Sequence, residues 1–240
     1  MTDQTIMQNA PVDYVRKPWF RAVKKLVGVF IHAPRFIYLG EKPGNKCIIL
    51  SNHEGTSVPL KLELYSRLPI RFWGAGPMNH NFSHAYEYQT KIYYHQKKHW
   101  NLWLARLFCL LATPLTRMFY IGLDLISTYP DARFSGTLKK SIAALKKNHT
   151  VVIFPEDSSE GYLKELKGFH QGSLMLLELC RKHELDVPVY IAYYNKQTDQ
   201  HVFDAPVTVS QLLDQGLDRA QLAQKLCDRC NELGRMTFES

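Results

Sequence analysis

Residues 48–57 read Ile48-Ile49-Leu50-Ser51-Asn52-His53-Glu54-Gly55-Thr56-Ser57. Three apolar residues lead directly into a polar turn that contains a glycine and a histidine, which is typical of a buried strand that stops at a functional loop. The pattern recurs where residues 151–154 lead into Pro155-Glu156-Asp157-Ser158-Ser159-Glu160-Gly161. In an open α/β sheet, ligands sit beyond the carboxyl ends of the strands. The sequence therefore predicts that His53 and Glu156 lie on one rim of such a sheet.

The rest of the chain supplies further strands and helices for an α/β fold. Short apolar runs predict strands over residues 47–50, 70–73, 119–123, 151–154 and 187–193, with a later edge strand over 202–209. Apolar residues at helical spacing predict helices over residues 57–67, 134–147, 168–183 and 217–233. We therefore expect a mixed, mostly parallel sheet flanked by helices, preceded by an N-terminal amphipathic helical segment.

Four short blocks resemble the glycerolipid acyltransferases, the lysophosphatidic acid acyltransferase family. Asn52-His53, followed after four residues by Val58-Pro59, resembles the first block of that family. Phe154-Pro155-Glu156 with Ser158-Ser159, then Lys167-Gly168, then Val187-Pro188-Val189, resemble later blocks in the family's order. The resemblance covers roughly residues 45–195. It implies transfer of an acyl chain from acyl-CoA or acyl carrier protein to a hydroxyl of a (lyso)phospholipid or related lipid, with no separate cofactor.

The resemblance also implies roles for individual residues. His53 would be the general base, which suits an imidazole because its pKa near 6.5 allows proton transfer at neutral pH. The residues that the resemblance gives a substrate-binding role are Asn52, Asp124, Phe154, Pro155, Glu156, Ser158, Ser159, Lys167 and Gly168.

Two departures from the family pattern concern the chemistry directly. Val58 stands where the family has an acid, so the group that should orient the histidine is missing. Asp157-Ser158-Ser159 stands where the family has Gly-Thr-Arg, so the acceptor need not be a glycerophosphate. We expect Glu54 or Asp157 to replace the missing acid. The alternative is a catalytically inactive acyltransferase-like protein that binds lipid.

Charge and cysteine content restrict the partners. The chain of 240 residues has a net charge of +8 and a pI of about 9.2, which favours an anionic partner. No nucleic-acid-binding motif is present, so a membrane surface is the expected partner, with the acyl-CoA or acyl carrier protein donor. Five cysteines predict reduced thiols in the cytoplasm, with Cys227 and Cys230 packed rather than binding metal. The sequence leaves the oligomeric state open.

Residues 1–40 are expected to form a basic amphipathic segment that contacts the membrane, and residues 41–240 the acyltransferase-like domain. A helix can begin at Pro18. Its apolar side holds Trp19, Phe20, Val23, Leu26, Val27, Phe30 and Ile31, flanked by Lys17, Arg21, Lys24 and Lys25. This pattern suits an anionic lipid interface, whereas the alternative is a helix packed on the domain with its charged side in water. No signal-peptide pattern is found, so we expect a cytoplasmic protein peripheral to the membrane.

Residues 78–118 resemble an insertion between the family's first two blocks. The pairs His80/His84 and His95/His99 have a spacing that a metal site can use, but no acid or cysteine completes either set. We expect no metal, and a metal-dependent enzyme is a third alternative. The uncharged run between Arg106 and Arg117 is about half the length of a membrane span, and Pro114 interrupts it. We expect a core helix, or an interfacial or re-entrant hairpin, that contacts the acyl chain or the membrane.

Overall fold

The two strands predicted to carry the site are adjacent at the centre of the sheet. In the computed structural model, which describes residues 16–76, 82–157 and 161–238, β2 (Ile48–Ser51) pairs in parallel with β5 (Thr150–Ile153). Every residue of both strands is buried. A strand covered on both faces has no reason to alternate polar and apolar residues, which explains the continuous apolar runs in the sequence.

The sheet is mixed and mostly parallel, as predicted. Its strand order is β1-β7-β6-β2-β5-β3-β4, and β8 pairs with β6 beside this path. Only the pairs of β6 with β7 and with β8 are antiparallel in the part of the chain that the structure describes. The other strands are β1 (Arg35–Tyr38), β3 (Ile70–Ala75), β4 (Ile126–Thr128), β6 (Pro188–Asn195), β7 (Gln200–Phe203) and β8 (Val207–Thr208).

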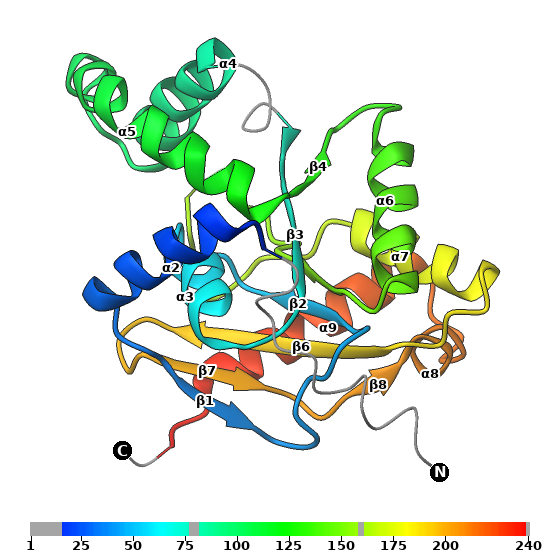
Figure 1. Cartoon of the computed structure of the whole chain (residues 1–240). Helices are drawn as coiled ribbons and strands as arrows, with labels where there is room; N and C mark the ends of the chain where they lie inside the picture. Colours follow the sequence, from blue (N-terminus) through cyan, green and yellow to red (C-terminus); the bar gives the residue numbers. More distant parts are fainter. Residues whose placement is uncertain (1–15, 77–81, 158–160, 239–240) are drawn as a thin grey trace.

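Helices cover both faces of this sheet. One face packs against α6 (Phe134–Lys146), α7 (Gly172–Lys182), α8 (Val209–Leu213) and α9 (Arg219–Arg235). The other face packs against α2 (Pro18–Phe30), α3 (Ser57–Tyr65) and the end of α5 (Leu102–Leu123). Beyond the carboxyl end of β3 lie α4 (Phe82–Glu87) and the π-helix η3 (Tyr88–Lys97), which pack on α5 (Figure 1).

The predicted boundary at residue 40 is wrong, because the residues before it belong to the α/β domain. β1 forms an edge of the sheet and pairs in parallel with β7. The Phe20 ring is fully buried, and a Cβ at Gly122 would come within 2.0 Å of it. Arg16 forms a buried ion pair with Glu63 at 2.7 Å. The helix α2 is therefore docked on the domain, while Leu26 and other apolar residues of it remain exposed.

Two strand predictions were wrong. Residues 119–123 form the last turns of α5, and the next strand is β4. A run of five apolar residues fits a strand or a helix, and periodicity cannot separate the two. Pro114 lies inside α5 without ending it. Residues 202–209 form β7 and β8, with β7 between β1 and β6 rather than at the edge, and β1 was not predicted.

Candidate functional site

Strand register brings His53 and Glu156 to the same level at the edge of the sheet. Leu50 is opposite Ile153 in the β2–β5 pair, and each functional residue follows three positions later. The main chain of His53 lies close enough to the Glu156 carboxyl to act on its pKa. The predicted convergence of these two loops is therefore confirmed.

The His53 imidazole lies between two aromatic rings. It stacks on Tyr162 with 5.2 Å between ring centroids and an interplanar angle of 12°. The edge contact with Phe154 has a centroid distance of 4.6 Å. The side chain is half-buried, so these rings hold the imidazole in place and leave part of it accessible.

Residues of the predicted insertion close over the loop that carries His53. Gly55 has a φ of +62°, and a Cβ there would lie 3.1 Å from the Tyr93 hydroxyl oxygen. The Nζ atoms of Lys97 and Lys98 lie 5.7 and 5.3 Å from the centroid of the Tyr162 ring. Tyr93, Lys97 and Lys98 of the insertion therefore lie against the loop that carries His53.

Burial moves the pKa values of His53 and Glu156 in opposite directions. Burial, together with the positive charges of Lys97 and Lys98, lowers the pKa of His53 to about 4. Burial raises the pKa of Glu156 to about 7, with the nearby Glu54 charge adding to the rise. At neutral pH the imidazole is therefore uncharged, as a base must be, and the carboxyl is about half protonated.

Neither Glu54 nor Asp157 bonds to His53 in place of the missing acid, so this prediction is wrong. The Nδ1 atom of His53 is buried and has no hydrogen-bond partner among the residues that the structure describes. Val58 lies in the first turn of α3 and is fully buried in the core. Glu54 lies 3.7 Å from the Nζ atom of Lys196, and Asp157 is exposed. Neither predicted carboxylate therefore orients the imidazole in this structure.

Asn52 holds the loop rather than a substrate. Its side-chain amide donates to the Tyr194 carbonyl at 3.1 Å, and its carbonyl oxygen accepts from the Tyr194 N–H at 2.7 Å. The side chain is buried, so these bonds extend the β2–β6 pairing and fix the start of the His53 loop. Pro155 is likewise buried, and its carbonyl oxygen accepts a hydrogen bond from the His170 N–H at 2.6 Å.

The prediction that Asp124 belongs to the site is wrong. Asp124 follows α5 in the left-handed conformation, with a φ of 50°, and forms an ion pair with Arg71. Arg71 pairs with Val151 near the amino end of β5, whereas Glu156 follows the carboxyl end. Five residues of strand correspond to roughly 15 Å, too far for both carboxylates to contact one small group.

The segment with Lys167 and Gly168, predicted to bind substrate, lies toward α9. Phe169 forms an isolated antiparallel bridge with Glu156, which turns the preceding loop back along the domain. Lys167 is exposed, and a Cβ at Gly168 would lie 3.7 Å from the side-chain oxygen of Gln224 on α9. Ser158 and Ser159 lie outside the residues that the structure describes.

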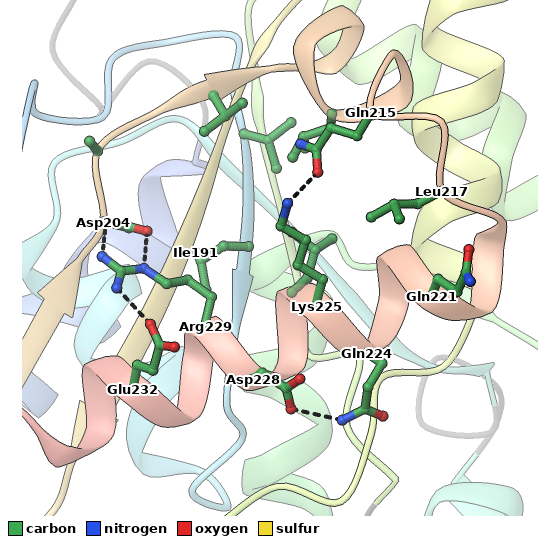
Figure 2. Close-up of a pocket in the computed structure, with 15 residues that line it drawn as sticks. Ile191, Asp204, Gln215, Leu217, Gln221, Gln224, Lys225, Asp228, Arg229 and Glu232 are labelled. Carbon is green, nitrogen blue, oxygen red and sulfur yellow. Dashed lines mark hydrogen bonds and ion pairs between the residues drawn. The ribbon is translucent and has the colours of Figure 1, made fainter.

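A separate cavity of about 910 Å³ lies between α9, α8 and β6 (Figure 2). In Figure 2 Arg229 points toward Asp204 and Glu232, with which it forms ion pairs at 2.6 and 2.8 Å. Lys225 donates to Gln215 at 2.6 Å. None of the lining residues belongs to the His53 or Glu156 loops, so this cavity is not the site described above.

The histidines of the insertion do not form a metal site in the part of the chain that the structure describes. No group of three His, Cys, Asp or Glu side chains is close enough there to hold an ion. His95 Nδ1 lies 2.8 Å from the Trp100 carbonyl oxygen, and His99 lies beyond the end of η3 with a φ of 57°. His80 is outside the described residues. Cys227 and Cys230 are buried in α9, so the prediction that they are packed is confirmed.

Tyr162, Lys97 and Lys98 were not predicted as site residues. For the two lysines the only signal in the sequence was the density of aromatic and basic residues between positions 78 and 100, and Tyr162 lies outside that stretch. No protein-family model matches the chain, and no curated protein matches it.

Proposed function

We propose that the protein is an O-acyltransferase that moves an acyl chain from acyl-CoA or acyl carrier protein to a hydroxyl of a (lyso)phospholipid or related lipid. The observation that carries this proposal is that an uncharged imidazole and a buried carboxyl both follow the carboxyl ends of the adjacent parallel strands β2 and β5 at matching positions. Ligands of α/β sheets bind at such strand ends.

The chemistry that we propose uses His53 as the base. His53 takes the proton of the acceptor hydroxyl, and the oxygen attacks the thioester carbonyl carbon. A C–O bond forms, the C–S bond breaks, and the imidazolium returns its proton to the leaving thiolate. Main-chain N–H groups where the loop enters α3 are suitable donors for the oxyanion. Protonated Glu156 can donate a hydrogen bond from the oxygen that has no partner among the described residues.

Exposed apolar side chains support a location on a membrane surface, which we propose is the cytoplasmic one. Within the described residues, α5 is long and apolar enough to span a membrane by length and composition, and little of it is buried in the protein. Its exposed apolar residues include Trp103, Leu104, Leu107, Leu110, Leu111 and Leu115, and α2 adds Leu26, Val29 and Phe30. A lipid surface is the partner that an apolar face of this size favours, together with the net charge of +8.

The test is acyl transfer by the His53→Ala variant. Purified protein is incubated with labelled acyl-CoA and lysophospholipid acceptors in vesicles, and the acylated product is measured. We expect the variant to lose turnover about 10²- to 10⁴-fold, because a positioned base contributes that much. The control is His183→Ala, an exposed histidine after α7. Unchanged turnover in His53→Ala would show that His53 is not the base.

A second candidate is a lipid-binding protein without turnover. The observation that favours it is the buried Nδ1 atom of His53, which has no orienting carboxylate among the described residues. Such a protein would bind labelled acyl-CoA or lysophospholipid and form no acylated product with any donor. Product formation by the wild-type protein would exclude this candidate.

A further inference from the structure

Two lysines lie over the aromatic ring that stacks on the proposed base. Lys97 and Lys98, at the end of η3, place their Nζ atoms 5.7 and 5.3 Å from the centroid of Tyr162. The same ring stacks on His53. The positive charges of both lysines also lower the pKa of His53, so they lie close enough to act on the imidazole.

The carboxylates near these lysines do not fully neutralise them, which favours binding of an anion. Glu54 is paired with Lys196, and Glu156 is held near half protonation by burial. Burial lowers the pKa of Lys97, and the nearby charges of Glu156 and Asp157 oppose that change. Lys98 forms no ion pair with a carboxylate among the described residues. The pair therefore carries positive charge that the described carboxylates do not fully balance.

We propose that Lys97 and Lys98 form an anion site that holds a phosphate-type group of the substrate beside His53. This proposal rests on the proposed acyl transfer and names the charge of its substrate. Two ammonium groups on flexible stems suit a phosphate monoester, which carries close to two negative charges at neutral pH. The group can belong to the acceptor headgroup or to the CoA part of the donor. In this proposal Lys97 and Lys98 of the insertion bind the phosphate. A phosphorylated substrate is therefore compatible with Asp157-Ser158-Ser159 in place of the family's Gly-Thr-Arg.

The site also links substrate binding to the strength of the base. An anion bound by both lysines would neutralise the charges that lower the pKa of His53. The imidazole would then accept a proton more readily once the substrate is in place. Glu156 lies near Lys97, and its buried Oε1 atom has no partner among the described residues. Glu156 can therefore form a hydrogen bond with a substrate hydroxyl next to the phosphate.

The kinetic test compares wild type with Lys97→Gln/Lys98→Gln. The control is Lys91→Gln, an exposed lysine of η3 that pairs with Glu87. Acceptors are a 1-acylglycerol 3-phosphate and the matching uncharged 1-acylglycerol, and donors are acyl-CoA and the phosphate-free acyl-N-acetylcysteamine. We expect kcat/KM to fall about 10- to 100-fold in the double variant only where a phosphate is present. A loss that follows the acceptor phosphate assigns the site to the headgroup, and a loss that follows CoA assigns it to the donor. An equal loss in all four combinations, or no loss, would overturn the proposal.

A binding test separates this proposal from the proposed reaction. The line widths of the ³¹P signals of glycerol 3-phosphate and adenosine 3′,5′-bisphosphate are measured with each protein, after circular dichroism has shown that each is folded. We expect broadening of at least one probe by wild type and Lys91→Gln, and its loss with the double variant. Broadening that persists in the double variant, or is absent with wild type, overturns the anion site. Lysine-dependent binding without any turnover would support the anion site and contradict only the acyl transfer.

Discussion

The residues of the proposed site differ in how far the sequence could identify them. His53 and Glu156 follow buried strands directly, so their place at the sheet edge could be predicted from local pattern. Tyr162 and Lys98 come from irregular or inserted segments, and only the folded chain brings them to the imidazole. Asn52 matches a motif, yet its amide bonds to Tyr194, a partner that local pattern could not reveal.

Gly55 is the residue of the His53 loop that tolerates substitution least. Its φ of +62° favours glycine, and a Cβ would also lie 3.1 Å from the Tyr93 hydroxyl. We expect Gly55→Ala to lower the free energy of unfolding by about 1–2 kcal/mol, measured by urea denaturation. Gly44→Ala is the control, because nothing lies within 4 Å of a Cβ there. An equal effect at both positions would contradict the described loop conformation.

Glu156 makes stability depend on pH in a defined direction. Burial raises its pKa from 4.5 to about 7, so the folded protein holds the proton more tightly than the unfolded chain. The resulting stability is complete below pH 4.5 and is lost as the pH rises through 7, a difference of about 3 kcal/mol. His53 acts in the opposite sense, because its lowered pKa costs stability as the pH falls from 6.5 toward 4.

The variant Glu156→Gln isolates the carboxyl from the histidine. Gln has no proton to lose, so from pH 5 to pH 8 the variant should gain about 2.5 kcal/mol relative to wild type. The free energy of unfolding is measured by urea denaturation at both pH values. Glu165→Gln, on an exposed side chain, is the control. Parallel pH dependence of wild type and Glu156→Gln would show that Glu156 is not buried in this way.

At the scale of elements, most helices and strands could be predicted because their apolar spacing is regular. The helices predicted over 57–67, 134–147 and 217–233 are α3, α6 and α9 with small shifts at their ends. The failures share one cause: β1 and the end of α5 take their form from partners far away in the chain. β1 is short and only partly buried, and it exists through its pairing with β7.

The exposed apolar face of α5 predicts lipid binding that can be removed without unfolding the protein. Leu107, Leu111 and Leu115 lie four residues apart, so they share one face, and all three are exposed. We expect replacement of all three by Ser to weaken binding to anionic vesicles about 100-fold, at about 1 kcal/mol for each leucine that enters the lipid interface. Co-sedimentation with vesicles measures it. Leu217→Ser, outside α5, should leave binding unchanged, and full binding by the triple variant would contradict the prediction.

At the scale of the whole molecule, the N-terminal helix and the sheet fold as one body. The link is a buried cluster in which Glu63 pairs with Arg16 at 2.7 Å and with Lys24 at 2.9 Å. Arg16 also donates to the main-chain carbonyls of Leu123 and Ile70. Sequence patterns place each segment separately, and no pattern in them shows that these four segments meet.

The cluster predicts a large cost for a small change. Glu63→Gln removes the charge that balances Arg16 in the interior, and we expect the free energy of unfolding to fall by about 3–5 kcal/mol. Glu178→Gln, which breaks the exposed pair with Arg219, should cost no more than about 1 kcal/mol. Urea denaturation of both variants checks this. A small effect at Glu63 would mean that α2 is not held by this cluster.

The central claim is that His53 and Glu156 act as parts of one site. A double-mutant cycle on acyl transfer tests it, with His53→Ala, Glu156→Ala and the variant that carries both. Residues that act as a unit give strongly non-additive losses. The account predicts that the double variant is about as slow as the slower single variant. Two losses that multiply, or full turnover without His53, would contradict it.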